Sequence, residues 1–524
     1  MTRLFDTVVI GGDIDALVAA IEIAGSGSKV LLVTEEVELG GCLRQVEFAP
    51  GFRAAPLGRD LGWVPAQILE LAGLSSVARH EADPAVIAFG EGPPLLLRRS
   101  VSDTSVCIGA LSRTDAQKWP EFCRRLRCMA GFLEELYRHP APRIGAQSPA
   151  DLLALAQLAR GFRSLRRAGM EELLRTIPMA ISDLLDDWFE SPLLKGALAA
   201  IAVRDLCQGP MGGGTAFNLL HQLAGAAEGI FGERLVVAGG AGLVIDALAR
   251  KARDAGVTIQ TQLGTQGLLV GDGSIRAVQL ANGEEIACRE VISASDPYRT
   301  LLQLIDPRHL EVETIQCLRR VRYRGVTSVV LLALERLPPL PRLPGPPTGI
   351  FVFAPTIAAV ERAYDAVKYG ACSEQPVVEM HFPSFADPAL APVGKHVAIL
   401  HVQYTPYALG DRQWDAATRE SVGARALQVI EGRLPGFGAC VSAGQVLAPP
   451  DLATLFGLRE GAVSRAEMGL DQVLFMRPIP GSARYATPID GLFLCGAGTH
   501  PGPGVAGVSG RLAARRLLSW RKRR

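Results

Sequence analysis

The sequence predicts an α/β protein built on a parallel, doubly wound sheet, and three observations support that prediction. Residues 6–36 change period twice, from a β-branched run through a glycine turn and a helical stretch to a second apolar run. A second α/β stretch covers residues 236–295. Residues 491–510 read as a buried strand, a glycine-dense loop and the start of a helix. Such loops let a backbone and helix N–H groups approach a flat or phosphorylated ligand.

Composition excludes some broad classes of function. The 524 residues leave room for about three domains and a large core. Lys and Arg total 54 against 53 Asp and Glu, so the net charge of +1 gives no bulk basic field for nucleic acid. The ten cysteines are dispersed without a C-x-x-C pair, which indicates reduced thiols and no metal site.

We expect a cytoplasmic protein. The N-terminus enters an apolar strand within a few residues and shows neither a basic region nor a small-residue cleavage site. The longest uncharged apolar stretches fall well short of the roughly 18 residues that a membrane-spanning helix needs. The basic tail SWRKRR therefore predicts at most a peripheral contact with anionic lipid. The alternative role is to complement the dipole at the C-terminus of a final helix.

The remaining elements follow along the chain. Residues 149–203 repeat apolar side chains at helical spacing and predict a helical insertion. Asp272-Gly273 and Asn282-Gly283 predict tight turns between antiparallel strands. Six prolines in residues 334–349 predict a rigid connector rather than a docking motif.

Segments that are distant in the sequence are expected to assemble into two domains. Residues 1–75, 225–300 and 470–524 are predicted to form one, with the first two strands adjacent and the last helix packed nearby. Residues 76–224 and 301–469 are predicted to form a substrate-binding domain that contains the helical insertion.

A series of segments in chain order resembles a known family. They are the N-terminal glycine turn, LGG (39–41), FAPGFRAAP (48–56), LLDDWFESPLLKGALA (184–199), GPMGGGTAFNLLHQLAG (209–225), VISASDPYRTLLQLIDP (291–307), LAPVGKHVAILHVQYTPYAL (390–409) and residues 470–518. The chain is similar from end to end to the phytoene desaturase-like FAD oxidoreductases, including the pyridine nucleotide-disulfide oxidoreductase domain 2 type. The resemblance implies an α/β fold with a Rossmann-type FAD-binding domain of the amine oxidase and phytoene desaturase type, joined to a mixed sheet-plus-helix substrate domain.

The resemblance also implies where FAD lies. In that family the C-terminal loop runs along the flavin ring and the ribityl chain, and the N-terminal turn faces the pyrophosphate. An apolar cavity lined mainly by Leu, Val, Ile and Phe is expected to open toward Gly498. The candidate cofactor-binding residues are Gly11, Gly12, Asp13, Ala16, Thr34, Glu35, Gly40, Gly41, Arg44, Gly496, Ala497, Gly498, Val505, Ala506 and Gly507.

The N-terminal turn departs from the dinucleotide fingerprint. That pattern has a glycine where the backbone approaches the pyrophosphate and an acid about 20 residues on for the ribose hydroxyls, but Asp13 and Thr34 stand there. A carboxylate about 5 Å from a phosphate costs on the order of 3 kcal/mol at an effective dielectric near 20. Asp15 adds a second charge nearby. We therefore expect FAD binding to be weakened or lost.

Further residues bear on that expectation. Asp13 at the first turn of a helix can accept hydrogen bonds from the free N–H groups, which would fill the anion site internally. Glu35 offers a substitute ribose acid, and Arg44 offsets the repulsion if it faces the phosphates rather than solvent. Arg465 stands where the resembling family usually has a histidine, which changes the expected lining near the ring.

Hydride transfer to a flavin obliges no side chain to act as an acid or base. His500 could relay a proton or only fix its loop, and Asp471 could approach the ring edge or cap a turn. Asp296 is expected to cap a helix or turn, and His221 to be a satisfied core residue. The sequence shows no Ser-His-Asp order, P-loop or metal-ligand spacing.

Two classes of function follow. The prediction is a FAD-dependent oxidoreductase, dehydrogenase-like or desaturase-like, that acts on a hydrophobic substrate such as an isoprenoid or a lipid. The alternative is a flavin-free member of the same fold that binds a lipid, escorts a partner, or forms a subunit beside a flavin-bearing paralogue.

Overall fold

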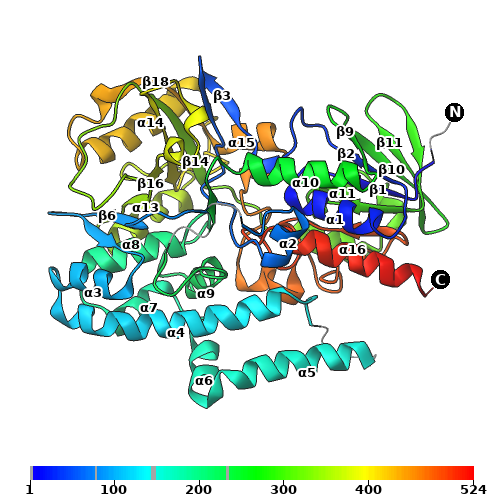
Figure 1. The fold of residues 1–524 in the computed structure, drawn as a ribbon, viewed down its shortest axis with the longest axis horizontal. Helices are drawn as coiled ribbons and strands as arrows, with labels where there is room; N and C mark the ends of the chain where they lie inside the picture. Colours follow the sequence, from blue (N-terminus) through cyan, green and yellow to red (C-terminus); the bar gives the residue numbers. More distant parts are fainter. Residues whose placement is uncertain (1–3, 77–78, 143–148, 232–234, 524) are drawn as a thin grey trace.

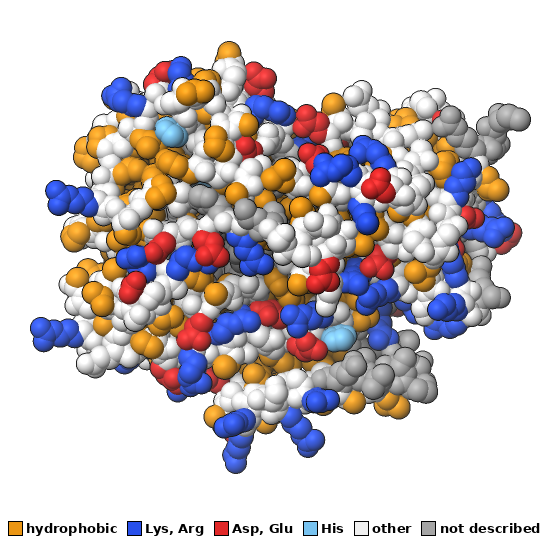
Figure 2. Space-filling model, in the orientation of Figure 1, with side chains coloured by type: hydrophobic (Ala, Val, Ile, Leu, Met, Phe, Trp, Pro, Cys, Tyr) orange, Lys and Arg blue, Asp and Glu red, His pale blue; other side chains and the backbone are white. Residues whose placement is uncertain are grey.

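The computed structural model describes residues 4–76, 79–142, 149–231 and 235–523. Figure 1 shows two sheet-based parts side by side, with a layer of helices along the bottom of the view. Both chain ends lie in the right-hand part, where the first strands and the last helix are neighbours. On the face shown in Figure 2, positive and negative side chains are interspersed.

The right-hand part is organised by a five-stranded sheet in the order β19-β13-β1-β2-β9. All four pairings are parallel, and β1 pairs directly with β2 as predicted. Strands from all three segments predicted for this domain meet here, while the exact domain boundaries stay a prediction. The strands are β1 (Thr7–Ile10), β2 (Val30–Val33), β9 (Thr258–Gln260), β13 (Glu290–Ser293) and β19 (Leu492–Leu494).

Helices cover this sheet and bring the two ends of the chain together. α1 (Ile14–Ala24) packs against both α10 (Gly242–Asp254) and the last helix, α16 (Val508–Arg521). The approach of α16 is very close, because a Cβ at Gly510 would lie 2.0 Å from the Asp15 carbonyl oxygen. The Arg521 Nε at the end of α16 donates to Glu290 Oε1 at 2.7 Å, so the predicted basic tail is partly anchored.

A three-stranded antiparallel sheet follows β9. It consists of β10 (Thr265–Gly271), β11 (Ser274–Leu280) and β12 (Glu285–Ala287). Asp272 and Gly273 at the first turn have φ of 51° and 70°, and Gly283 at the second has φ of 84°. Two successive left-handed residues suit the two-residue turn at Asp272-Gly273, and one left-handed glycine is typical of a three-residue loop such as residues 281–283. Both predicted hairpins are confirmed.

A seven-stranded mixed sheet organises the left-hand part, in the order β18-β14-β17-β16-β15-β6-β7. Only the β15–β6 pairing within it is parallel. The strands are β6 (Val86–Phe89), β7 (Leu95–Leu97), β14 (Thr327–Leu334), β15 (Ile350–Phe353), β16 (Val377–His381), β17 (His396–Gln403) and β18 (Val441–Leu447). The proline-rich segment connects β14 to β15 without a helix or strand, as predicted.

Short strand pairs and helices complete the two parts. The pairs are β3 (Val46–Ala49) with β4 (Phe52–Ala54) and β5 (Arg79–His80) with β8 (Val236–Val237). The helices are α2 (Ala66–Leu71), α11 (Pro297–Leu302), α12 (Val312–Arg320), α13 (Ile357–Lys368), α14 (Ala416–Glu431) and α15 (Pro449–Phe456).

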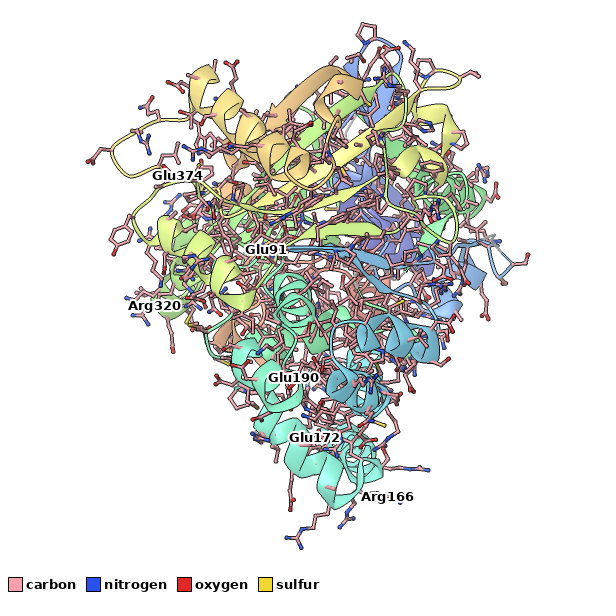
Figure 3. All side chains as sticks on the ribbon, turned by 90° about the vertical axis from the view of Figure 1, so that its left-hand side faces the viewer. Glu91, Arg166, Glu172, Glu190, Arg320 and Glu374 are labelled. Atoms are coloured by element: carbon pink, nitrogen blue, oxygen red, sulfur yellow. The ribbon has the colours of Figure 1, made fainter. Side chains whose placement is uncertain are left out.

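The helical insertion is longer than the sequence prediction. Its helices are α3 (Val101–Gly109), α4 (Arg113–Tyr137), α5 (Pro149–Ser164), α6 (Arg166–Thr176), α7 (Ile181–Trp188), α8 (Pro192–Ala202) and α9 (Thr215–Gln222). The prediction missed α3 and α4, although Ser112 caps α4 by accepting from the Asp115 N–H at 3.1 Å. Figure 3 shows Arg166 and Glu172 of α6 at the protruding end of this layer.

No helix in the described parts of the chain is long and apolar enough to cross a membrane.

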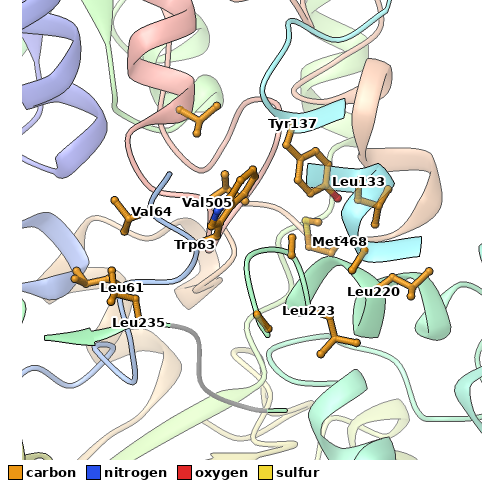
Figure 4. Close-up of a cluster of buried hydrophobic side chains, with 14 of the residues drawn as sticks. Leu61, Trp63, Val64, Leu133, Tyr137, Leu220, Leu223, Leu235, Met468 and Val505 are labelled. Atoms are coloured by element: carbon orange, nitrogen blue, oxygen red, sulfur yellow. The ribbon is translucent and has the colours of Figure 1, made fainter. Parts of the chain in front are cut away.

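The insertion and the C-terminal glycine loop meet in one buried cluster, shown in Figure 4. Trp63 exchanges backbone hydrogen bonds with Gly504 and Ala506, each 2.9 Å long, so that residues 61–64 run beside the loop. Leu133 and Tyr137 of α4 pack nearby. The helical layer therefore supports one wall of the region where the two ends of the chain meet.

Candidate functional site

The turn between β1 and α1 forms the centre of the site. Gly11 has φ of 123°, and a Cβ there would lie 3.0 Å from the Cβ of Ala294. Asp13 follows in extended conformation as the N-cap of α1, and its Oδ1 accepts from the Ala16 N–H at 2.9 Å. The chain thus fills the N-terminus of α1 with its own carboxylate, which is one of the two roles considered for Asp13.

Asp15 does the same for a second helix. Its Oδ1 accepts from the Ser509 hydroxyl at 2.7 Å and from the Gly510 N–H at 3.0 Å, both in the first turn of α16. Burial, and secondly the carboxylate of Asp13, raise the pKa of Asp15 to about 7. Burial also raises the pKa of Asp13. Two helix N-termini therefore converge on one place, and each already holds an aspartate.

Arg465 supplies the opposing charge. Burial lowers the pKa of its guanidinium, but Cys42, Asp13 and Asp296 facing it outweigh burial and hold that pKa above its usual value. Its Nη2 lies 3.8 Å from the Cys42 sulfur. Arg465 lines two cavities, one on each side of the β1–α1 turn. Arg465, which stands where the resembling family usually has a histidine, is therefore a cation between two cavities that carboxylates line.

The first cavity has a volume of about 240 Å³ and lies beside the C-terminal glycine loop. The sequence predicted a lining mainly of Leu, Val, Ile and Phe, but the lining is mixed, because apolar side chains such as Ile14, Leu57 and Val463 share it with charged ones. Seven charged side chains line it: Asp13, Asp15, Arg59, Asp60, Arg204, Asp205 and Arg465. The physical reason lies in β16 and β17, whose buried Glu379, His401 and Gln403 require polar partners on the same side of the sheet.

A largely buried ion network engages Glu379 on that polar sheet face, while His401 Nε2 keeps no hydrogen-bond partner. Arg59 Nη1 lies 2.9 Å from Asp205 Oδ2, and Arg204 Nη2 lies 2.9 Å from Glu379 Oε2. Arg59 Nε is also 3.5 Å from Glu379 Oε2. Thr327 donates to Asp205 Oδ1 at 2.8 Å. The network links the segment after β4, the end of the helical insertion and the second sheet.

The second cavity, of about 60 Å³, lies at the ends of β1 and β2. Glu35 and Glu36 both line it, as do Asp13 and Asp296. Glu35 is exposed and forms a double ion pair with Arg299 at 2.7 and 2.9 Å, whereas Glu36 is more buried. Thr34 Oγ1 accepts from the Glu36 N–H at 3.3 Å. The predicted residues Thr34 and Glu35 therefore lie at this cavity, and sequence reasoning missed Glu36 beside them.

Three buried oxygens of the second cavity have no hydrogen-bond partner: Glu36 Oε2, Asp296 Oδ2 and Thr265 Oγ1. Burial raises the pKa of Glu36 and of Asp296. Asp296 also caps α11, since its Oδ1 accepts from the Tyr298 N–H at 2.8 Å, as predicted. Unpartnered buried oxygens are costly, so they mark positions for the donors of a ligand.

The other predicted N-terminal residues divide into two groups. Gly40 and Gly41 lie under the turn, where Gly40 N–H donates to the Gly12 carbonyl at 2.8 Å and a Cβ at Gly41 would meet the Asp13 Cβ at 3.0 Å. Arg44 instead donates to the Leu455 carbonyl and covers the Phe456 ring at 4.9 Å. Arg44 lines neither cavity and stands on the outer side of the site.

Three of the six residues predicted from the C-terminal loop line the first cavity, which Gly502, Pro503 and Gly504 of the same loop also line. Ala497, Val505 and Ala506 line the first cavity. Gly496 N–H donates to the Ser509 hydroxyl at 2.7 Å, Gly507 is the N-cap of α16, and a Cβ at Gly498 would lie 2.5 Å from Pro297. These three glycines fix the conformation of the loop but do not line the first cavity.

Neither of the two catalytic candidates, His500 and Asp471, lines the first or the second cavity. His500 is fully buried and donates from Nε2 to the His139 carbonyl at 3.2 Å, and burial lowers its pKa to about 4. Asp471 pairs with Arg322 at 2.7 Å on the surface. His221 does line the first cavity, but it is satisfied as predicted, with Nε2 donating to the Pro503 carbonyl and Nδ1 meeting the Tyr137 hydroxyl, both at 2.8 Å.

Comparison with known proteins identifies the family. Residues 17–518 match the model of the flavin containing amine oxidoreductases. The chain belongs to this family. It is 32% identical over 538 residues to the pyridine nucleotide-disulfide oxidoreductase domain-containing protein 2 of Rattus norvegicus, covering 97% of this chain and 92% of the relative. It is 28% identical to the neurosporene-forming phytoene desaturase of Rhodobacter capsulatus, over 58% of each chain.

Solved structures show the same fold. An oxidoreductase from Methanosarcina mazei aligns with a TM-score of 0.61 at 17% identity, covering 98% of this chain and all of the other. A putrescine oxidase bound to putrescine also aligns with a TM-score of 0.61, at 13% identity, covering 99% of this chain and all of the other. The predicted α/β fold of the amine oxidase type is confirmed.

Membership of the flavin containing amine oxidoreductases implies FAD, and the residues of this chain fit it in part. The second cavity offers unpartnered acceptors for ribose hydroxyls or an adenine amine, and the first offers loop backbone for a flat ring. The pyrophosphate would lie between them, beside Asp13 and Arg465. The fit is good at the ends of the cofactor and poor in its middle when both aspartates are ionised.

Proposed function

We propose that this chain is a FAD-dependent oxidoreductase that binds its cofactor reversibly. The observation behind the proposal is that two cavities meet at Asp13 and Arg465, one with acceptors for a nucleoside and one beside the C-terminal glycine loop. That arrangement matches an extended dinucleotide.

Each part of FAD would have its own partners. Glu36 and Asp296 would hold the adenosine, Arg465 would face the phosphates, and Ala497, Val505 and Ala506 would lie along the ring. When bound, FAD supplies an acceptor for hydride. The chain itself would orient FAD and the substrate and shield them from water. His221 fixes the carbonyl of Pro503 in the loop, and the ion network holds the opposite wall of the cavity.

The lining of the first cavity bears on the substrate. A phytoene desaturase is among the relatives, but an all-hydrocarbon substrate placed against seven charged side chains would leave them desolvated without new partners. We therefore propose that the part of the substrate next to the ring is polar, which narrows the prediction from the sequence of a hydrophobic substrate such as an isoprenoid or a lipid.

The test is a flavin titration of wild-type protein and two variants, followed by quenching of FAD fluorescence. Asp13→Gly removes charge and bulk at a small cost in helix capping, and Asp13→Asn removes the charge alone. Each should raise FAD affinity more than tenfold, which holds even if the Coulomb estimate of on the order of 3 kcal/mol is twice too large. Asp246→Asn, at an exposed carboxylate of α10, should leave the affinity unchanged.

Wild-type protein purified without added flavin should be colourless or partly loaded. A stoichiometrically yellow wild type whose flavin survives dialysis contradicts the reversible-binding proposal.

A specific observation also favours a second candidate. Aspartates occupy the N-termini of both α1 and α16, where an anionic ligand would otherwise bind. As the alternative, we propose that the chain is a flavin-free partner subunit beside a flavin-bearing paralogue. Failure of both Asp13 variants to bind FAD, in folded protein, would favour this candidate over the enzyme.

A further inference from the structure

A third cavity of about 80 Å³ adjoins the first. Leu43, Arg59, Asp60 and Leu61 line both, so the segment after β4 borders the two spaces. The remaining walls come from the start of α10 and from the chain that follows β16. Most of this lining is apolar and includes Leu235, Val237, Ile350, Phe382, Pro383 and Leu390.

Two residues that line this cavity have a buried polar atom without a hydrogen-bond partner. One atom is Arg59 Nε, which lies 3.5 Å from Glu379 Oε2, and the other belongs to His381. His381, at the end of β16, is 8% exposed, and its Nε2 makes no hydrogen bond. Burial, together with Arg59 and Arg204, lowers the pKa of His381 to about 3, so the ring is neutral at physiological pH. A neutral imidazole has one nitrogen that donates and one that accepts, so this atom can pair with a hydroxyl or an amide.

The charged groups at the edge of the cavity are already engaged. Arg59 pairs with Asp205 at 2.9 Å, and Asp387 accepts from Gln45 Nε2 at 3.3 Å. Asp60 Oδ1 accepts from the Gly62 N–H at 2.7 Å. An apolar space with one open polar position is the usual character of a small-molecule site.

We propose that the third cavity takes the apolar end of the substrate, so that the substrate is an amphiphile whose polar, reacting end lies in the first cavity. The proposal rests on the proposed function and names its substrate class. It joins the apolar lining of the third cavity to the charged side chains of the first. The volume is below that of cavities that hold benzene, at about 150 Å³, so the apolar end is a short or branched alkyl group.

The test uses flavin-free wild-type protein and trifluoroethanol, a small apolar probe with one hydroxyl, followed by fluorine NMR. Saturable broadening of the probe signal is expected. Straight-chain alcohols should compete, with affinity rising about fourfold for each added methylene until the cavity is full.

Two variants locate the binding. No atom lies within 4 Å of the position that a Cβ would take at Gly242, which lines the cavity with an ordinary φ, so Gly242→Leu can fill space there without strain. It should weaken probe binding at least tenfold. His381→Phe, which removes the unpartnered nitrogen, should weaken it several-fold. His396→Phe, at a ring stacked on Phe385 outside the cavity, is the matched control and should have no effect.

Absence of saturable binding, or binding that Gly242→Leu and His381→Phe both leave unchanged, overturns the proposal. The result is independent of the flavin titration because the probe is measured without FAD. Loss of flavin binding with intact probe binding would count against the proposed function alone.

Discussion

At the scale of single residues, the site depends on where carboxylates stand. Asp13 and Asp15 occupy the N-termini of α1 and α16, and both Glu35 and Glu36 line the second cavity. The two aspartates stand where a backbone glycine and free N–H groups would favour an anion. We therefore expect the charge state of these carboxyls to set the affinity for an anionic ligand.

The pKa of Asp15 predicts a pH dependence. Its pKa lies near 7, above that of a free aspartate, and a nearby phosphate would favour the protonated form. FAD affinity should therefore rise several-fold as pH falls from about 8 to about 6. The same proton uptake should stabilise the flavin-free fold over that window. Titrations at several pH values measure the first effect and thermal denaturation the second. Asp15→Asn should flatten both profiles, and a profile that keeps its slope in this variant contradicts the assignment.

A further prediction concerns Glu36, which we propose binds the adenosine end of FAD. Glu36→Gln in an Asp13→Gly background should weaken FAD binding about fivefold, since one hydrogen bond to a charged acceptor becomes a neutral one. Fluorescence titration measures this. Glu38→Gln, at an exposed carboxylate paired with Arg53, is the matched control and should have no effect. Equal affinities for the Glu36 and Glu38 variants would remove Glu36 from the site.

At the scale of elements, the contact between α1 and α16 sets the geometry around the turn. A methyl group at Gly510 would lie 2.0 Å from the Asp15 carbonyl oxygen, so Gly510→Ala must push the two helices apart. We expect a loss of about 1–3 kcal/mol in the free energy of unfolding, measured by urea denaturation. Gly242→Ala, also in the first turn of a helix but in open space, should be neutral or slightly stabilising. Similar losses in both variants would contradict the close-packing argument.

Among the elements, those determined by residues close in sequence could be predicted. The β1–turn–α1 unit, both hairpins and the proline-rich connector were predictable because residues close in sequence determine them. Arg465 and Glu379 were not, since their partners lie far away along the chain and only the fold brings them together. The predicted lining of Leu, Val, Ile and Phe differs from the observed one for the same reason, because the partners of Arg59 and Arg204 cannot be read from local periodicity.

At the scale of the whole molecule, the ion network ties the two sheets and the helical insertion together. Glu379→Gln would remove the buried carboxylate charge that Arg59 and Arg204 share. Breaking such a network costs about 3–5 kcal/mol, which urea denaturation would show as a lower midpoint. Glu335→Gln, at a surface pair with Lys395, is the control and should leave the midpoint unchanged. An unchanged midpoint in the Glu379 variant would mean that the network adds nothing to stability.

The strand order of the first sheet has a consequence for biosynthesis. β13 ends at Ser293, but its outer neighbour β19 begins only at Leu492, so the ribosome adds roughly 200 residues before that edge can be covered. At about 5–20 residues per second this takes on the order of 10–40 s. An uncovered strand edge is a template for aggregation, which makes the nascent chain a client for chaperones. Because α16 follows β19, the packing of α16 against α1 that fixes the N-terminal turn forms only after these last elements have been synthesised.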